Sequence, residues 1–168
     1  MKMRELNDLA AAYWDHYRLF TSKDRAERLR SDELDWASDE IDELVAEQPD
    51  DAISTLVFLA DAAPDDGALG YLGAGPVEEL IIGHGSDVVI DRVEGAARRN
   101  ERFRMALASA WYDDHVTPEV RERLRVFGGG AEHADVDLPI KRERRKGAGS
   151  LSRDVQAKRT RGDRGSSG

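Results

Sequence analysis

Two adjacent glutamates and a histidine in the middle of the chain carry the side chains that acid–base chemistry uses. Glu78 and Glu79 stand shortly before His84, and a carboxylate that orients an imidazole can support general acid–base catalysis near neutral pH. Tyr71 lies upstream and would share their pocket. The same residues also fit helix ends, because carboxylates are favoured in the first turn and a cation in the last. We treat Glu78, Glu79 and His84 as candidates for a Glu/His enzyme site and prefer helix capping as their interpretation.

The glycines just before these glutamates suggest an anion site. Gly73-Ala74-Gly75 precedes Pro76, and glycine lets backbone N–H groups approach a phosphate at the start of a helix. No strand is predicted before this segment, however, and Glu78 stands where the dinucleotide fingerprint has its third glycine. Two carboxylates in the first turn would also repel phosphate. The sequence therefore predicts a structural turn, and no cofactor.

A metal site is not predicted either. Asp113, Asp114, His115 and Glu119 supply oxygen and imidazole ligands, but they lack the paired spacing that places two ligands on one helix face. The chain has no cysteine, which excludes thiolate ligands, a cysteine nucleophile and disulfides.

The aromatic residues exceed what one narrow helix stripe needs. Most should form the core, while one or two should face outward as anchors for a partner, where Trp and Tyr are enriched. We expect Trp14 and Tyr112 in this role, with Tyr71 as a further binding candidate. The residues considered are Tyr13, Trp14, Tyr17, Trp36, Phe58, Phe103, Trp111 and Tyr112.

Hydrophobic residues recur at three- and four-residue steps along the first three quarters of the chain, which predicts amphipathic helices. Ser31, Asp50, Ser86 and Thr117 are expected to cap four of them, and proline or glycine to end several. No alternating pattern predicts a strand. The fold class is therefore all-α, an irregular bundle of about seven short helices, with a small helical-repeat stack as the alternative. The expected helices span residues 6–20, 31–48, 50–63, 76–83, 86–99, 103–111 and 117–127.

Charge and composition divide the chain into a body and a tail. The net charge is -9, but residues 141–168 carry ten Lys and Arg against three Asp and Glu, so that residues 1–140 hold 15 basic and 31 acidic residues. No aromatic residue follows Phe127, so the end of the chain cannot build a core. We expect an acidic helical domain over residues 1–128 and a disordered basic tail over residues 129–168.

No apolar stretch approaches the roughly 20 residues of a membrane span, and the N-terminus lacks the apolar run of a signal peptide. With no cysteine in the chain, a reducing compartment is the simplest expectation. We predict a cytoplasmic protein without membrane contact.

The order of several motifs is similar to that of a known family. After a first helix with Trp and His come Gln-Pro-Asp-Asp-Ala (48–52), Gly-Ala-Gly-Pro-Val-Glu-Glu-Leu-Ile (73–81), His-Gly (84–85), Ile-Asp-Arg-Val-Glu (90–94) and Arg-Phe-Arg-Met-Ala-Leu-Ala-Ser-Ala-Trp (102–111). Over residues 5–128 the chain resembles a family of small, uncharacterised bacterial proteins with a Gly-x-Gly-Pro-hydrophobic-Glu-x-Leu motif followed by His-Gly. The resemblance implies a compact helical domain of bacterial origin and carries over no activity, cofactor or catalytic residue.

Three functions follow from these patterns. The first is a non-enzymatic interaction module that binds a protein partner, expected to be basic, through the acidic helical surface, as small immunity or inhibitor proteins do. The second is accessory nucleic-acid binding through the tail. The third is an enzyme with the Glu/His site described above. The tail residues expected to contact phosphates are Lys141, Arg142, Arg144, Arg145 and Lys146.

Overall fold

The structure, a computed structural model, describes residues 3–112 and 115–128, most of which are helical. These residues contain no strand, and the all-α prediction is confirmed. All of them belong to one compact unit. None of the described helices is long and apolar enough to cross a membrane. In chain order the elements are α1 (Met3–Phe20), α2 (Arg25–Ser31), η1 (Asp32–Leu34), α3 (Asp35–Glu47), α4 (Pro49–Ala62), α5 (Asp66–Leu72), η2 (Gly73–Val77), α6 (Glu78–Gly83), α7 (Asp87–Arg99), α8 (Glu101–Leu107) and α9 (Pro118–Arg125).

Two helices, α2 and α5, were not predicted, and two predicted caps are wrong. Ser31 does not begin α3, because it is the buried last residue of α2 and its hydroxyl donates to the carbonyl oxygen of Arg28 at 2.7 Å. Asp50 does not cap α4, because that helix begins one residue earlier at Pro49. Proline suits this first position, since it has no N–H that would need a partner.

Side-chain caps explain why several of these helices begin where they do. A carboxylate or amide oxygen accepts a backbone N–H in the first turn of three helices, each at 2.8 Å: Asp24 from Ala26, Asp65 from Ala68 and Asn100 from Phe103. Thr117 accepts from Val120 in the same way. Such a cap stabilises a helix by about 1 kcal/mol, because it satisfies an N–H group that has no partner within the helix.

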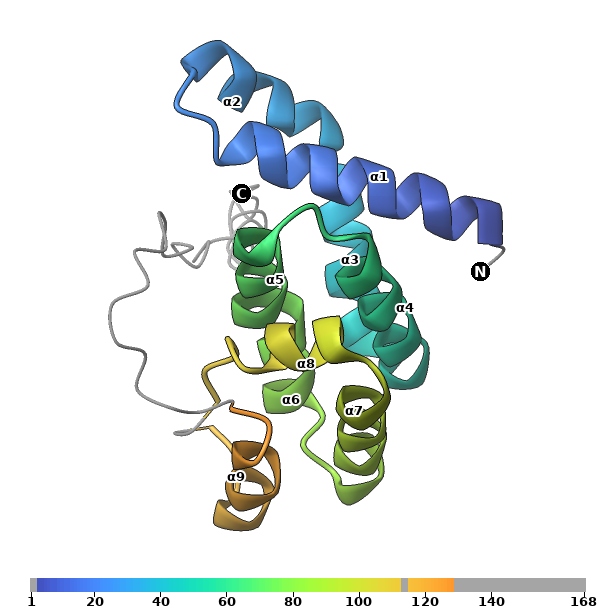
Figure 1. The fold of residues 1–168 in the computed structure, drawn as a ribbon. Helices are drawn as coiled ribbons and strands as arrows, with labels where there is room; N and C mark the ends of the chain where they lie inside the picture. Colours follow the sequence, from blue (N-terminus) through green and yellow to red (C-terminus); the bar gives the residue numbers. More distant parts are fainter. Residues whose placement is uncertain (1–2, 113–114, 129–168) are drawn as a thin grey trace, which may run out of the picture. The chain divides into compact units, whose positions relative to one another are not determined.

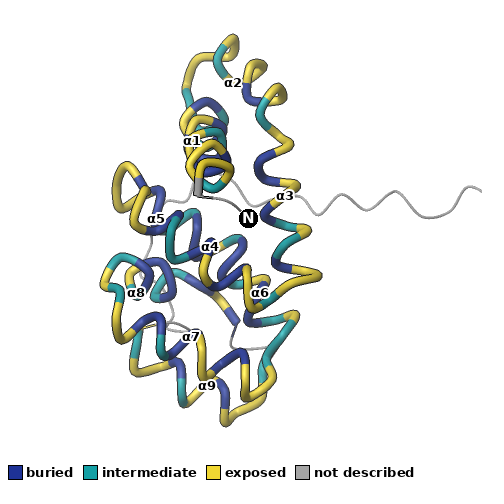
Figure 2. The backbone as a smooth tube through the Cα atoms, turned by 90° about the vertical axis from the view of Figure 1, so that its right-hand side faces the viewer, coloured by how far each residue is buried: buried dark blue, intermediate teal, exposed yellow. Residues whose placement is uncertain are grey.

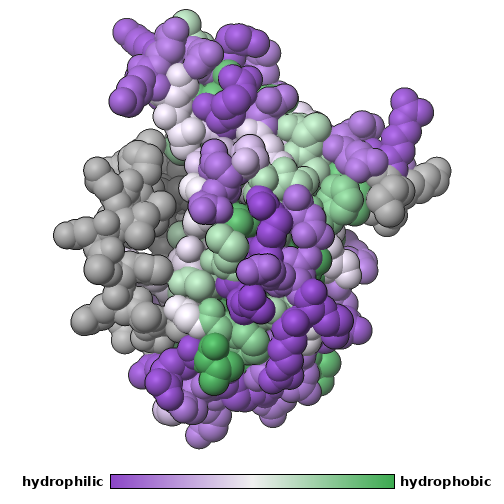
Figure 3. All heavy atoms as spheres, viewed as in Figure 1, coloured by the Kyte–Doolittle hydropathy of each residue, from purple (hydrophilic) through white to green (hydrophobic). Residues whose placement is uncertain are grey.

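The short helix α8 lies at the centre of the packing (Figure 1), in contact with α4, α5, α7 and η2. Phe103, Ala106 and Leu107 of α8 have no exposed surface. The long helix α1 packs against α2 and α3 at one end of the unit, and α9 packs against α7 at the other. Figure 2 shows the buried residues on the inner sides of the helices. On the face shown in Figure 3, most residues over α2 and over α9 are hydrophilic. Hydrophobic residues are visible in the region between these two helices.

An aromatic cluster joins α1 to α5. The ring centroid of Tyr71 lies 5.0 Å from that of Tyr17 and 6.2 Å from that of Tyr13, and Tyr13 makes an edge contact with Trp14 at 4.9 Å. Burial raises the pKa of Tyr17, and the nearby carboxylate of Asp65 and Tyr71 raise it further. The cluster buries aromatic surface between two helices that are far apart in the sequence.

The prediction that Trp14 and Tyr112 face outward is wrong. Trp14 is 8% exposed and its indole N–H donates to the carbonyl oxygen of Leu59 at 3.2 Å, while Tyr112 is fully buried. The exposed tryptophans are Trp36 and Trp111, with 47% and 57% of their surface accessible.

Candidate functional site

The glycine segment η2 is a packing contact with α8. A Cβ atom placed on Gly73 would lie 2.0 Å from the carbonyl oxygen of Ala106 and 2.8 Å from the Cβ of Ser109. Only glycine allows the two backbones to approach this closely. The predicted turn, with a helix beginning at Pro76, is wrong: Gly73–Val77 form a helical segment that contains Pro76 and is kinked at Gly75 (φ -123°, ψ -108°). The contact with α8 explains why residue 73 is a glycine.

Glu78 makes the next link between these two regions. Its carboxylate accepts the backbone N–H of Trp111 at 2.9 Å, which joins the start of α6 to the segment that follows α8. Burial raises the pKa of Glu78, and the charge of Glu79 adds to the increase, whereas the Trp111 N–H and His115 lower it. We had expected this carboxylate to satisfy the N-terminus of its own helix. The partner is instead 33 residues away.

The other members of the predicted Glu/His site do not converge on Glu78. His84 follows the last residue of α6, and its backbone N–H donates to the carbonyl oxygen of Leu80 at 2.9 Å. The glutamates begin the helix, so the two groups are separated by about 9 Å along its axis. One groove of the described unit lies elsewhere, between α4 and α7, with a volume of about 360 Å³ and a lining of Ile53, Ser54, Val57, Ala96, Arg99 and Asn100. The geometry gives the enzyme alternative no assembled site.

A buried histidine, His16, links α1 to α3. Nε2 of His16 lies 3.0 Å from Oδ1 of Asp35, and Nδ1 lies 3.3 Å from Oγ of Ser38. The ring also stacks on Phe20 at 5.8 Å. Serine, histidine and aspartate are the residue types of a nucleophilic triad, but Ser38 is only 6% exposed, so a substrate would have little access to its hydroxyl. The arrangement serves as a polar cross-link between two helices.

No described residues form a group of three or more possible metal ligands. Asp113 and Asp114 of the predicted oxygen-rich group lie outside the residues that the structure describes. The predicted tail over 129–168, with its phosphate-binding candidates, also lies outside them.

The outer side of α3 carries an exposed tryptophan and four exposed carboxylates. Relative to Trp36, these acidic residues follow at three, four, seven and eleven positions, which places all five within about 100° of the helix circumference. The opposite side of α3 is buried (Figure 2). None of the five side chains makes a hydrogen bond, ion pair or ring contact with another described residue. We call this set the Trp36 stripe: Trp36, Asp39, Glu40, Glu43 and Glu47.

A simple sequence signal marks the region around the Trp36 stripe, and our sequence analysis missed it. Residues 31–91 contain 17 Asp and Glu and no Lys or Arg. The acidic excess of the body thus falls entirely within these 61 residues. Fifteen of the 17 carboxylates are exposed.

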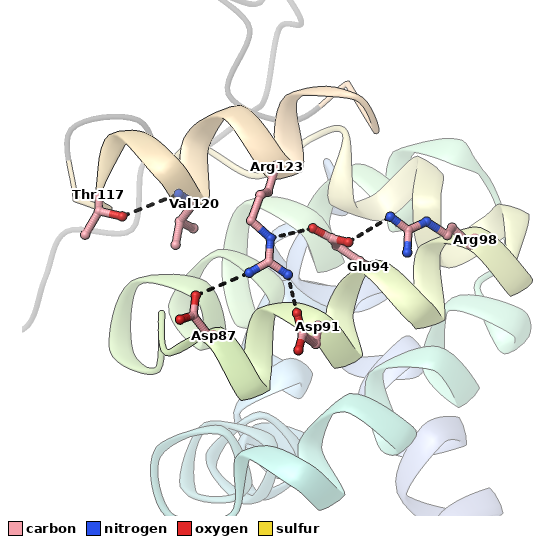
Figure 4. Close-up of polar contacts among 7 residues, drawn as sticks. All are labelled: Asp87, Asp91, Glu94, Arg98, Thr117, Val120 and Arg123. Atoms are coloured by element: carbon pink, nitrogen blue, oxygen red, sulfur yellow. Dashed lines mark hydrogen bonds and ion pairs between the residues drawn. The ribbon is translucent and has the colours of Figure 1, made fainter.

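The carboxylates of α7 have a different environment (Figure 4). Arg123 of α9 donates from Nε to Glu94 at 2.7 Å, from Nη1 to Asp87 at 3.3 Å, and from Nη2 to Asp91. Glu94 is 8% exposed and accepts a second bond from Arg98 at 2.8 Å. The hydrogen bonds that Arg123 donates to Glu94 and Asp91 hold the pKa of its guanidinium above the usual value. This network, here called the α7–α9 junction, fastens the last described helix to the unit.

Comparison with known proteins places the chain in a family but adds no activity. No curated protein and no solved structure matches it. A family model does match, over residues 24–129, a range that includes the Trp36 stripe, the glycine segment and the α7–α9 junction. The chain therefore belongs to DUF6869, a family of unknown function.

Proposed function

We propose that this protein is a non-enzymatic interaction module that binds a basic protein partner through the acidic surface of residues 31–91. The observation that carries this proposal is the charge segregation described above, with 17 carboxylates and no Lys or Arg in that range. A surface of one sign attracts an oppositely charged partner from a distance and speeds its association.

The lack of cationic partners for the carboxylates of the Trp36 stripe, within the described residues, supports an external partner. The chain has arginines that pair with acidic groups elsewhere, as Arg123 does with Glu94, but none reaches the four carboxylates of the Trp36 stripe within the described residues. Their charge is therefore available to a second molecule. Salt weakens such an interaction, because the Debye length is about 8 Å at physiological ionic strength.

The test is affinity purification from the native host at low and high salt, followed by measurement of binding to the recovered proteins in purified form. We expect basic proteins to be recovered at about 50 mM salt and lost at about 0.5 M salt, where screening is nearly complete. Neutralising the stripe with D39N, E40Q, E43Q and E47Q should weaken binding at least about tenfold.

A matched control removes four exposed carboxylates outside residues 31–91, through D8N, D15N, E101Q and E119Q. Net charge changes equally, so binding should fall by less than about twofold if the acidic segment is the interface. Equal losses in both variants, or the absence of any basic protein among those recovered, would refute the proposal.

Nucleic-acid binding through the tail is a second proposal, supported by the ten Lys and Arg of residues 141–168. Replacing Lys141, Arg142, Arg144, Arg145 and Lys146 by serine should abolish retention of DNA or RNA in a mobility-shift assay. It should also lower the salt dependence of binding, because fewer counterions are released from the nucleic acid. Deletion of residues 141–168 removes all ten basic residues, and unchanged retention after that deletion would exclude the tail.

A further inference from the structure

The Trp36 stripe combines two features that rarely coexist on a surface helix without a role. A large aromatic side chain is 47% exposed although it makes no hydrogen bond or ring contact with a described residue. It is flanked on the same side of the helix by carboxylates only. Exposed tryptophans of this kind are enriched at the centres of protein interfaces.

The stripe also breaks the local rules of helix stability. Asp39, Glu43 and Glu47 are spaced four residues apart, and like charges at this spacing repel each other. Glu43 and Glu47 lie in the last turns of α3, where the helix dipole disfavours anions and no basic residue is present. Sites that break such rules without internal compensation are expected to be functional.

The indole and carboxylates of the Trp36 stripe fit an arginine side chain better than a lysine side chain. An arginine guanidinium is planar, stacks on an indole ring and can bind a carboxylate through two parallel hydrogen bonds. A lysine ammonium is a compact point charge, strongly hydrated, and lacks that shape. Trp36 and the carboxylate of Glu40, one helical turn further along, would engage one guanidinium together.

We infer that the Trp36 stripe is the docking site for an arginine-bearing segment of another protein, with one guanidinium stacked on the Trp36 indole and further arginines on the carboxylates of α3. This inference rests on the proposed function and specifies its partner chemistry. The stripe spans eleven residue steps, or about 16 Å along the helix axis. It therefore accommodates about five residues of an extended chain.

The test measures the binding of two labelled peptides, ten arginines and ten lysines, to the full-length protein by fluorescence anisotropy at about 50 mM salt. The peptides have equal charge, so a difference in affinity reports on the guanidinium itself. We expect the wild type to bind the arginine peptide about fivefold more tightly than the lysine peptide. W36A should remove this preference by weakening the arginine peptide alone, and W36F should keep part of it.

W111A is the matched control, because Trp111 is the other exposed tryptophan and lies outside the stripe. It should leave both affinities unchanged. D39N/E43Q should weaken both peptides, since it removes charge and leaves the indole in place. Thermal denaturation of each variant establishes that it is folded.

The outcomes separate this inference from the proposed function. If W36A leaves the preference for arginine intact while D39N/E43Q weakens both peptides, the tryptophan anchor is refuted and the acidic interface stands. If neither peptide binds the wild type, both are refuted. An equal loss of arginine preference in W36A and W111A would also overturn the assignment to the stripe.

Discussion

The outer side of α3 and the α7–α9 junction use the same carboxylate chemistry in opposite ways. At the junction, Glu94 is nearly buried and has two arginine partners. On α3, Glu43 and its neighbours in the Trp36 stripe are exposed and have no cationic partner among the described residues. A buried carboxylate without a cation would be strongly destabilising, whereas an exposed one costs little. The difference distinguishes carboxylates that are paired within the described residues from carboxylates that are not.

The contact between η2 and α8 resembles the α7–α9 junction, because each joins two helices of the described unit. Both contacts therefore stabilise the second half of that unit. The Trp36 stripe makes no such contribution. Substitutions in the two kinds of region should therefore differ in size and in sign.

The largest effect is expected from G73A. The added methyl group would press on the backbone of α8 at Ala106, which cannot move without displacing the buried residues of that helix. Overpacking of this kind costs about 3 kcal/mol or more. G70A is the control: its Cβ would meet only Ser109 Oγ at an ordinary 3.8 Å, so it should be neutral or slightly stabilising. Urea denaturation measures both, and equal stability of the two variants would contradict the close contact.

R123M tests the junction and should have the next largest effect. The substitution removes the bonds from α9 to Glu94, Asp87 and Asp91 while keeping an apolar side chain of similar length. We expect a loss of about 2 kcal/mol, because Glu94 keeps Arg98 as its second partner and is not left wholly unpaired. Thermal denaturation provides the measurement. R125M removes an exposed pair with Glu122 and should have a much smaller effect.

The sequence predicted the longer helices but not α2 and α5. Helices such as α3 and α7 bury one side over 13 residues each, so their hydrophobic periodicity is visible. The helices α2 and α5 have seven residues each. Two turns are too few to show a period, and packing against α1 and α8 decides the conformation instead.

The site was less predictable, because exposure depends on neighbours that are distant in the sequence. Trp14 and Trp36 both lie on amphipathic helices. Trp14 is buried because α1 packs against α4, where the carbonyl oxygen of Leu59, 45 residues away, accepts its indole N–H. The bond from Trp111 to Glu78 likewise has no local pattern. The acidic segment can be predicted from the count of charged residues in 31–91, whereas the net charge of residues 1–140 as a whole does not show where the acidic residues lie.

E43Q tests the Trp36 stripe, and it should raise the stability of the protein whereas G73A and R123M lower it. Removing this charge relieves repulsion with Asp39 and Glu47 and an unfavourable interaction with the helix dipole. We expect the protein to gain about 0.5 kcal/mol of stability, detected as a higher melting temperature at low salt and a smaller gain at high salt. The same substitution in α9, E122Q, should lower stability, since Glu122 is paired with Arg125. Loss of stability in both variants would mean that the stripe carboxylates have partners that stabilise the fold.

The smallest effect is expected at Glu78. Its carboxylate accepts a backbone N–H, as the paired carboxylates accept bonds, but it pairs with no arginine or lysine of the described residues. Burial raises its pKa in the folded state, so the folded protein binds the proton more tightly than the unfolded chain does. Stability from this group is therefore present at low pH and declines as the pH rises through the folded pKa. E78Q, whose amide oxygen can still accept the Trp111 N–H, should gain stability relative to the wild type between about pH 4 and 7. E122Q should show the opposite trend at lower pH, below about pH 4, because Arg125 lowers the pKa of Glu122 and the stability from its charged form is lost as the pH falls through the folded pKa. Denaturation curves from about pH 2 to 7 would measure both trends, and the same direction of change in both variants would contradict the difference between these two carboxylates.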